Sequence, residues 1–361
     1  MIAANCRVGI VGAGTSGVYL ASLLQQQGFQ VALFEKAPYP RTEGCGILLV
    51  QAGMAALQQG NPQICQAIIQ AGAPVSRFEF RNLRGDLINA EPVSYAADEL
   101  PGMLVHRKAI LHALLDALSP ECLHGNADLQ SVTQTDSSVI AHFKDGRQWE
   151  GDLLVGADGI LSQVRPAVVS DVQLCYLGDL VWRGIVEDQT FCPAGNFIVY
   201  VRGRGIYANF FDIGGGLTHW GFFVEQQQQE DEDSILRPQD PSIPAAELAK
   251  LPEDARAIIE ATPPAQIVSR YSYDIDPLPR LQQGRIVLIG DAAHAKSPTR
   301  ARGMTSGFED ALALSRHLTA GADVSTALAA FEAERLPIVH EYQRTSREMS
   351  RKIGRRHKQA A

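Results

Sequence analysis

The first stretch of the chain combines short apolar runs with a longer segment of helical spacing. A mostly apolar run, Arg7–Val11, is followed by Gly12 and then by a helical pattern that continues to Gln27. A second apolar run, Gln30–Phe34, ends at Glu35. This order predicts a strand, a helix and a second, parallel strand, which is the opening unit of a parallel sheet.

Further along, three patterns predict regular elements. Apolar residues from Ile110 to Leu118 recur at helical spacing and predict a core helix. Residues 131–149 alternate and contain the turn pair Asp145-Gly146, which predicts an antiparallel hairpin. The apolar stretch 151–159 that follows predicts another buried strand.

The pattern changes between about residues 171 and 273, where strand-like runs are separated by glycine-rich turns. This region predicts a β-rich insert, and the polar segment 225–234 within it predicts an exposed loop. Residues 284–294 then return to a buried strand that ends in Gly290-Asp291, and residues 307–317 continue as a helix. The chain thus leaves a Rossmann-type domain and comes back to it.

These patterns predict an α/β fold in which a mainly antiparallel β-sheet domain is inserted into a Rossmann-type domain. The predicted Rossmann-type domain is discontinuous and comprises residues 1–75, 100–170 and 281–340. The β-rich domain comprises residues 76–99 and 171–280, and residues 341–361 form a C-terminal helix and a basic tail.

Composition narrows the possible partners. A chain of 361 residues, 45% hydrophobic and 20% charged, suits two joined globular domains. The formal charge of −8 provides no counterion-release drive toward nucleic acid. No apolar run approaches the roughly 20 residues of a membrane span, so we expect a cytoplasmic protein. The six cysteines form no C-x-x-C pair, and we expect free thiols and no bound metal.

A glycine motif lies between the first predicted strand and helix. Gly12 allows a tight turn, Gly14 lets a pyrophosphate approach the helix N-terminus, and Gly17 permits close helix packing. Glu35 can accept hydrogen bonds from both ribose hydroxyls of an adenosine, and it disfavours a 2′-phosphate. The motif predicts a dinucleotide site and does not by itself separate FAD from NAD.

Two further motifs lie far downstream. Asp158-Gly159 follows a predicted strand, with Arg165 shortly after it, and Gly290-Asp291 follows another strand, with Pro298 seven residues on. Together with the glycine motif, Arg41, the segment 44–47 and Arg107, these motifs occur in one order along nearly the whole chain. In this order the chain resembles the class A flavoprotein monooxygenases, the family of para-hydroxybenzoate hydroxylase.

The resemblance implies a non-covalent FAD site on a para-hydroxybenzoate hydroxylase-like fold. Asp291 would accept hydrogen bonds from the ribityl hydroxyls, and Arg107 would lie near the pyrophosphate or ribityl chain. Arg41 would be a mobile-loop arginine near FAD and the nicotinamide cofactor, and Asp158 would serve FAD positioning and nicotinamide docking. The candidate cofactor-binding residues are Gly12, Gly14, Ser16, Gly17, Glu35, Lys36, Arg41, Arg107, Asp158, Asp291, Pro298, Gly303, Met304 and Thr305.

The segment after Pro298 departs from the family, which usually has Gly-Gln-Gly where this chain has Ala301, Arg302 and Gly303. Backbone amides of Met304 and Thr305 can still donate to a flavin carbonyl, because that contact needs no particular side chain. Arg302 has two interpretations. A cation at the flavin pyrimidine ring would favour the anionic reduced flavin and raise its potential, whereas a side chain that points to solvent or pairs with an acid would not.

The function that the resemblance implies is FAD-dependent hydroxylation of a small aromatic substrate. NADH or NADPH would reduce FAD, dioxygen would give a flavin hydroperoxide, and its distal oxygen would be transferred to the substrate. The substrate would lie between the flavin and the β-rich insert, with Arg183, Tyr207 and Trp220 as candidate contacts. The alternation along those strands does not decide which of their two faces points toward the flavin. We name no catalytic acid or base and interpret His294 as a packing or hydrogen-bonding residue.

Three other interpretations stay open. A two-component monooxygenase would take reduced flavin from a separate reductase, and an FAD-dependent reductase would share the same FAD motifs. A non-catalytic FAD-binding protein would keep the fold without a reaction. The expected partners are a small-molecule substrate and dioxygen. We expect no nucleic acid and no membrane span, and the chain is expected to be a homodimer or a monomer.

Overall fold

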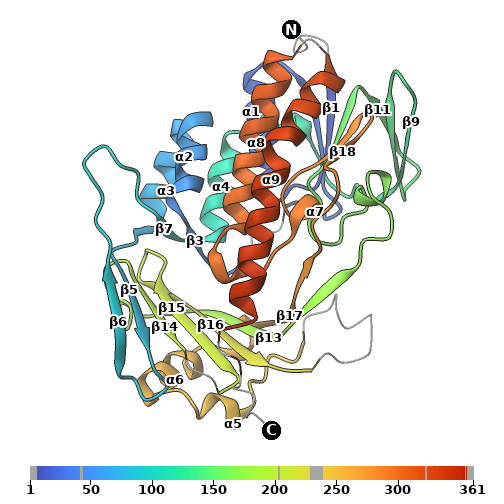
Figure 1. Ribbon diagram of the computed structural model, residues 1–361. Coiled ribbons are helices and arrows are strands. Elements are labelled where there is room, and N and C mark those ends of the chain that lie inside the picture. Colours follow the sequence, from blue (N-terminus) through green and yellow to red (C-terminus); the bar gives the residue numbers. More distant parts are fainter. Residues whose placement is uncertain are drawn as a thin grey trace.

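The computed structural model describes residues 6–40, 44–201, 204–227, 239–321, 323–353 and 355. Figure 1 shows an upper α/β part and a large lower sheet, with one long helix running from the first to the second. Within the described ranges no helix is long and apolar enough to cross a membrane. All six cysteines are free thiols, and the same ranges contain no acidic, histidine or cysteine cluster that could hold a metal ion.

The upper part is built on a six-stranded sheet. Its strands are Arg7–Val11 (β1), Gln30–Phe34 (β2), Leu123–His124 (β8), Leu153–Gly156 (β12), Gln282–Gln283 (β18) and Ile286–Leu288 (β19). Their order is β18-β19-β12-β1-β2-β8, and all neighbours are parallel except β18 and β19. The central strands are apolar on both faces because helices or a second sheet cover each face. The predicted parallel unit is therefore confirmed.

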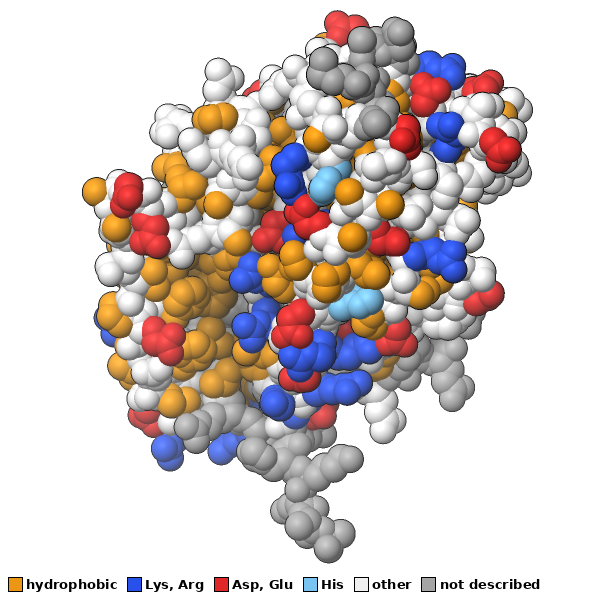
Figure 2. All heavy atoms as spheres, turned by 45° about the horizontal axis from the view of Figure 1, so that its top comes forward, with side chains coloured by type: hydrophobic (Ala, Val, Ile, Leu, Met, Phe, Trp, Pro, Cys, Tyr) orange, Lys and Arg blue, Asp and Glu red, His pale blue; other side chains and the backbone are white. Residues whose placement is uncertain are grey.

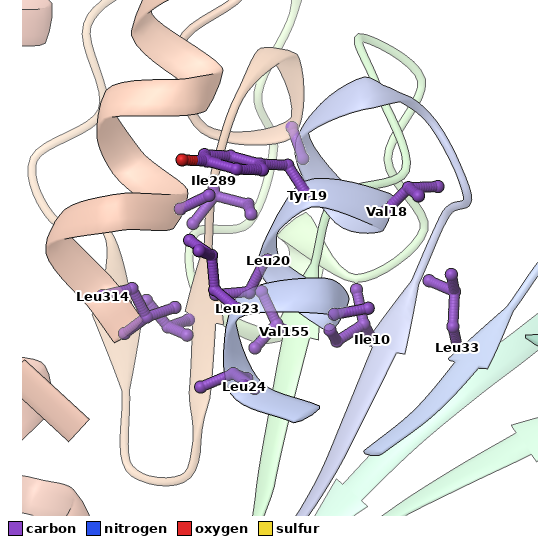
Figure 3. Close-up of a cluster of buried hydrophobic side chains, with 14 of the residues drawn as sticks. Ile10, Val18, Tyr19, Leu20, Leu23, Leu24, Leu33, Val155, Ile289 and Leu314 are labelled. Atoms are coloured by element: carbon purple, nitrogen blue, oxygen red, sulfur yellow. The ribbon is translucent and has the colours of Figure 1, made fainter. Parts of the chain in front are cut away.

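Helices cover this sheet or pack against the helices that cover it. They are Thr15–Gln26 (α1), Gln51–Gly60 (α2), Pro62–Ala71 (α3), Arg107–Asp116 (α4), Asp291–His294 (α7), Gly303–Ala320 (α8) and Val324–Ser350 (α9). Figure 3 shows side chains of α1 packed on strand residues and on Leu314 of α8. The ring of Tyr19 meets Phe308 edge-on at 5.3 Å between centroids, and its hydroxyl donates to the carbonyl of Ala56 at 2.7 Å. These contacts join α1, α2 and α8 around one core.

Two small antiparallel sheets complete the upper part. Leu129–Gln134 (β9), Val139–Phe143 (β10) and Gln148–Gly151 (β11) form one of them, which confirms the hairpin predicted over residues 131–149. Gly46–Leu49 (β3), Ala73–Pro74 (β4) and Met103–His106 (β7) form the other. β7 leads directly into α4, so this second sheet sets where the α4 N-terminus lies.

The lower sheet has seven strands in the order β17-β13-β16-β15-β14-β5-β6. Its strands are Arg77–Arg81 (β5), Leu87–Pro92 (β6), Leu174–Glu187 (β13), Asn196–Tyr200 (β14), Ile206–Asp212 (β15), Leu217–Glu225 (β16) and Val268–Ile275 (β17). Every neighbouring pair is antiparallel except β14 and β5. The prediction of a mainly antiparallel sheet is confirmed.

The two faces of the lower sheet are buried by different partners. Residues of Ala245–Leu248 (α5) and Glu253–Glu260 (α6) cover one face, which we call the helix face, over Trp182, Trp220 and Phe222. The other, which we call the cavity face, carries Tyr207, Phe211 and Phe223 and packs against Leu104 of β7. Figure 2 shows a hollow on one side of the molecule with mainly hydrophobic walls and with Lys and Arg side chains gathered beside it.

The C-terminal region differs from its predicted bounds. α9 begins after Asp323, whose carboxylate caps the helix by accepting from the Thr326 amide at 2.9 Å. The predicted boundary at residue 340 therefore falls inside a single helix. The basic tail and the polar loop 225–234 lie partly outside the described residues.

Candidate active site

Three sequence motifs meet at the carboxyl ends of β1, β12 and β19, the edge at which open parallel sheets bind ligands. Gly12 has a φ of +105°, and a Cβ placed on it would lie 2.4 Å from the carbonyl oxygen of Ala157. A Cβ on Gly17 would lie 2.0 Å from the carbonyl oxygen of Gly12. Glycine is required at both positions because backbone already occupies that space.

Gly14 differs from its two neighbours. Its φ of −76° suits any residue, and a Cβ on it would meet no atom within 4 Å. The α1 helix begins directly after it, with no side-chain cap and no acidic residue in the first turn. An open space beside uncapped helix N–H groups is what a pyrophosphate requires, so these residues fit the dinucleotide.

Glu35 is held in place by backbone amides. One carboxylate oxygen accepts from Ala13 N at 3.1 Å, and the other accepts from Ala37 N at 3.0 Å. Each oxygen keeps a lone pair with which it can accept a ribose hydroxyl. The neighbouring candidate Lys36 is exposed.

We expect Glu35→Gln to weaken FAD binding by about tenfold to a hundredfold. The neutral amide loses charge-assisted hydrogen bonds, and its NH2 group cannot accept from either backbone amide. Titration of the apoprotein with FAD, followed by quenching of flavin fluorescence, measures this change. The exposed Glu121→Gln serves as the matched control, and equal affinity for the two variants would contradict a ribose contact at Glu35.

The Asp158 carboxylate stabilises the turn that follows it. Its carboxylate accepts from the Ser162 hydroxyl at 2.5 Å and from the amides of Gln163 and Val164 at 2.6 and 3.2 Å. Burial raises the pKa of this carboxyl, and those hydrogen bonds act against the increase. Arg165 donates to the carbonyl of Ala292 at 3.0 Å, which ties the turn to α7.

The Gly290-Asp291 motif lies beside the glycine motif. A Cβ on Gly290 would lie 2.8 Å from the Ser16 hydroxyl oxygen, and one on Gly307 would lie 2.1 Å from the same atom. Ser16 therefore contacts both the strand end and α8. Asp291 is exposed at the start of α7, so its carboxylate is open to a polyol chain.

Arg107 opens α4, and its backbone amide donates to the carbonyl of Cys45 at 3.0 Å. A Cβ on Gly44 would lie 3.2 Å from the Arg107 side chain, so the segment from Gly44 rests directly on this arginine. The candidate Arg41 lies outside the described residues.

The start of α8 has the same features as the start of α1. A Cβ on Gly303 would meet no atom within 4 Å, and the helix has no side-chain cap and no acid in its first turn. Met304 is half-buried and Thr305 is buried in this turn, after Pro298 and the short helix it opens.

The Arg302 guanidinium lies 4.8 Å from the ring centroid of Tyr342 on α9, a cation–π contact. Its effect on the flavin potential stays a prediction.

Ala301 has a φ of +53°, the left-handed region that favours glycine. We expect Ala301→Gly to raise the free energy of unfolding by up to about 1 kcal/mol, because glycine adopts this conformation without a Cβ clash. Urea unfolding of the FAD-loaded protein measures it. Ala257→Gly, at an exposed position inside α6, should destabilise instead by about 1 kcal/mol; destabilisation by both variants would contradict the strain at Ala301.

A buried polar network lies beneath Asp291. Asp310 accepts from His294 Nε2 at 2.5 Å, from Arg335 Nε at 2.9 Å and from the Gly290 amide at 2.9 Å. Lys296 Nζ lies 2.7 Å from His294 Nδ1 and donates to Ser306 Oγ at 2.8 Å. Burial lowers the pKa of Lys296 to about 8. The interpretation of His294 as a hydrogen-bonding residue agrees with this position, whereas Asp310, Lys296 and Arg335 showed no pattern in the sequence.

A cavity of about 1080 Å³ opens between the upper part and the lower sheet. Cys45 and Arg107 line it on one side, and Arg183, Ile185 and Arg270 line it on the other. Its volume exceeds the roughly 300–1,000 Å³ of a typical ligand pocket. The cavity therefore joins the predicted cofactor residues to the cavity face of the lower sheet.

The three candidate substrate residues do not share a face. Arg183 lines the cavity, and Tyr207 lies on the cavity face with its ring 4.5 Å from that of Phe223. Trp220 is fully buried on the helix face, where its indole donates to the Thr262 hydroxyl at 2.8 Å. Alternation along β16 sends residue 220 to the face opposite residue 221, which pairs with Arg183. Trp220 is therefore a core residue of the helix face and, in contrast to the prediction, not a substrate contact.

The glycine turn, the anchored Glu35, the exposed Asp291 and the adjoining cavity together define a flavoprotein-type dinucleotide site beside a large cavity. A family model described as an FAD binding domain matches residues 5–346, and the chain belongs to this family. The predicted resemblance to class A flavoprotein monooxygenases and the FAD cofactor are thereby confirmed.

Several known proteins are similar over almost the whole chain. The 3-amino-4-hydroxybenzoate 2-monooxygenase of Streptomyces cremeus is 30% identical, over 97% of this chain and 88% of its own. The aurachin C monooxygenase/isomerase of Stigmatella aurantiaca is 29% identical, over 92% and 86% respectively. The structure of Klebsiella pneumoniae HpxO complexed with FAD and uric acid has a TM-score of 0.84 at 24% identity, covering 96% of this chain and 88% of that one. The predicted enzyme class, an FAD-dependent monooxygenase, is confirmed.

Proposed function

We propose that this monooxygenase hydroxylates a small aromatic substrate held between the FAD site and the cavity face of the lower sheet. The observation that carries the proposal is the cavity of about 1080 Å³, which runs from Arg107 and Cys45 to Arg183 on β13. The names of the relatives, which include 3-amino-4-hydroxybenzoate and 6-hydroxynicotinate monooxygenases, support an aromatic substrate.

Residues of this chain would bind FAD, orient it and exclude water from the reacting atoms. The N-termini of α1 and α8 would hold the phosphates and the flavin carbonyl, and Asp291 would orient the ribityl chain. When bound, FAD supplies the electron transfer and the activation of dioxygen. The aromatic side chains of the cavity face would keep water away from the reacting atoms.

The remaining details extend this proposal. The reductant would be NADH or NADPH, the co-substrate would be dioxygen, and the enzyme would be cytoplasmic, as a monomer or a homodimer. The β-rich segments 76–99 and 171–280 would form the substrate domain, which agrees with the strands of the lower sheet.

The test uses the FAD-loaded enzyme with NADH or NADPH and a panel of aromatic acids that includes 3-amino-4-hydroxybenzoate and 6-hydroxynicotinate. We expect substrate-stimulated oxidation of the nicotinamide with matching oxygen uptake and one product that is one oxygen atom heavier by mass spectrometry. Activity only with supplied reduced flavin would indicate the two-component enzyme. A reduced product formed without oxygen uptake would indicate the reductase, and absence of turnover with every flavin donor would contradict the proposal.

A further inference from the structure

We propose that the buried ammonium group of Lys296, which lies beside the first turn of α8, raises the reduction potential of the bound flavin through its charge. Lys296 is in the loop between α7 and the short helix that begins at Pro298, and only 8% of the residue is exposed. The inference goes beyond the proposed function because it concerns the cofactor and no substrate. It rests on the part of that function that places the flavin carbonyl at the α8 N-terminus.

Hydrogen bonds hold the ammonium group of Lys296 against α8. Its Nζ donates to Ser306 Oγ at 2.8 Å and lies 2.7 Å from His294 Nδ1. An ammonium group has only donors, so the His294 ring accepts from it. The Ser306 hydroxyl donates in turn to the carbonyl of Arg302, the residue before α8, at 2.7 Å. The cation therefore lies beside the turn whose backbone amides would meet the flavin carbonyl.

This position is unfavourable for a cation in the protein alone. A helix N-terminus carries a partial positive charge and favours anions, and α8 has no acidic residue in its first turn. Burial lowers the pKa of Lys296 to about 8, although the carboxylates of Asp291 and Asp310 act against this decrease. An anionic group bound at the α8 N-terminus would remove part of the cost of the buried cation, and a reduced flavin is such a group.

The other charges around Lys296 are largely engaged with one another. The titratable or charged groups near it are Asp291 and His294 on α7, Glu309 and Asp310 on α8, and Arg335 on α9. Burial lowers the pKa of His294, so this ring is neutral at pH 7. Arg335 pairs with both carboxylates of α8 at 2.9 Å, whereas Lys296 reaches Asp310 only through the His294 ring. Asp291 is exposed, so water screens its charge.

Reduction changes the charge of the flavin. A nicotinamide that is oxidised transfers two electrons and one proton, so the neutral flavin ring becomes an anion whose charge lies on the pyrimidine ring. The Lys296 cation would stabilise this anion and would have little effect on the neutral oxidised ring. We expect Lys296 to increase the affinity for reduced FAD, relative to oxidised FAD, by about tenfold.

The potential of the FAD-loaded protein tests this inference without any substrate. Slow anaerobic reduction by xanthine and xanthine oxidase, with a reference dye, measures it. Lys296→Gln keeps a hydrogen-bond donor but removes the charge, and we expect it to lower the potential by about 30 mV, which is tenfold for a two-electron couple. Lys296→Met, which removes the charge and the donor, should give the same decrease.

Two further variants separate charge from hydrogen bonding. Ser306→Ala removes the hydrogen bond to α8 but keeps the lysine, so the potential should stay close to that of the wild type. Lys144→Gln is the matched control for the loss of a lysine, because Lys144 is exposed and pairs with Asp128 at 2.7 Å, on the small sheet of β9, β10 and β11. Its potential should equal that of the wild type.

The pH profile provides a readout that a merely structural role would not change. The difference in potential between the wild type and Lys296→Gln should be constant below about pH 8 and should shrink at higher pH, where the lysine loses its proton. If neither Lys296 variant binds FAD, the wild-type profile decides alone, because its slope should become steeper near pH 8.

Three results would overturn the inference. They are an unchanged potential in Lys296→Gln, a decrease in Ser306→Ala as large as that in Lys296→Met, and a difference from the wild type that persists undiminished well above pH 8. In the wild type alone, a slope that stays the same through pH 8 would have the same meaning. Failure to hydroxylate any aromatic compound would refute the proposed reaction and leave this inference standing, because no substrate enters the measurement.

Discussion

Gly14→Asp is expected to abolish FAD binding while leaving the fold intact. Gly14 has an ordinary φ of −76°, and a Cβ at this position meets no protein atom within 4 Å. A carboxylate would fill the space that a pyrophosphate needs and would repel it. At about 4 kcal/mol per pair of charges 4 Å apart near a surface, the expected loss is roughly a thousandfold in affinity.

The absorbance of bound flavin after gel filtration measures the loss of FAD binding. Thermal unfolding of the apoprotein shows whether the fold stays intact. Gly14→Ala should give an intermediate affinity, because it fills space without adding charge. Gly12→Ala is the contrasting variant, since its Cβ would strike the Ala157 carbonyl oxygen and the fold itself should suffer. An apoprotein of Gly14→Asp that unfolds well below the wild type would show that glycine is needed there by the fold.

Asp310→Asn is expected to lower the free energy of unfolding by about 3–5 kcal/mol, as is typical when one member of a buried ionic network is removed. The substitution removes one of the two carboxylates that pair with the buried Arg335, leaving Glu309 at 2.9 Å, and it disturbs His294 at 2.5 Å. Because the same carboxylate accepts from the Gly290 amide, the end of β19 should also loosen. Urea unfolding at pH 7 measures the loss.

The stability that Asp310 contributes should depend on pH in a defined direction. Burial alone would raise the pKa of the Asp310 carboxyl, but His294 and Arg335 outweigh burial and hold it well below its usual range. An acid with a lowered pKa in the folded state adds stability that is present above its unfolded pKa of about 4 and is lost at lower pH. The difference between wild type and Asp310→Asn should therefore be constant above about pH 4 and shrink below it.

An exposed ion pair provides the control for the Asp310 variant. Glu341→Gln breaks the pair with Arg344 on the surface of α9 and should change the free energy of unfolding very little, because solvent screens exposed charges. Equal effects of the two substitutions would mean that the network beneath Asp291 has no special role in stability.

Much of the cofactor site could be predicted from the sequence because its determinants are local. Gly12 and Gly17 are needed for turns and close packing within one strand-helix unit, and Glu35 ends the next strand. The distant Asp158 and Asp291 motifs each follow their own strand. The structure shows that the two aspartates differ. The Asp158 carboxylate is hydrogen-bonded within its own turn, whereas Asp291 is exposed.

The sequence by itself therefore determined the parallel unit, the order of the FAD motifs and the β-rich character of the insert. Only the tertiary structure decided which face of the lower sheet meets the cofactor side, because a strand has two alternating faces and both are apolar here. That choice placed Trp220 under α6 and brought Arg183 and Tyr207 to the cavity face. It also assembled the network of His294, Lys296, Asp310 and Arg335, whose members come from separate elements and acquire their partners only when these elements pack.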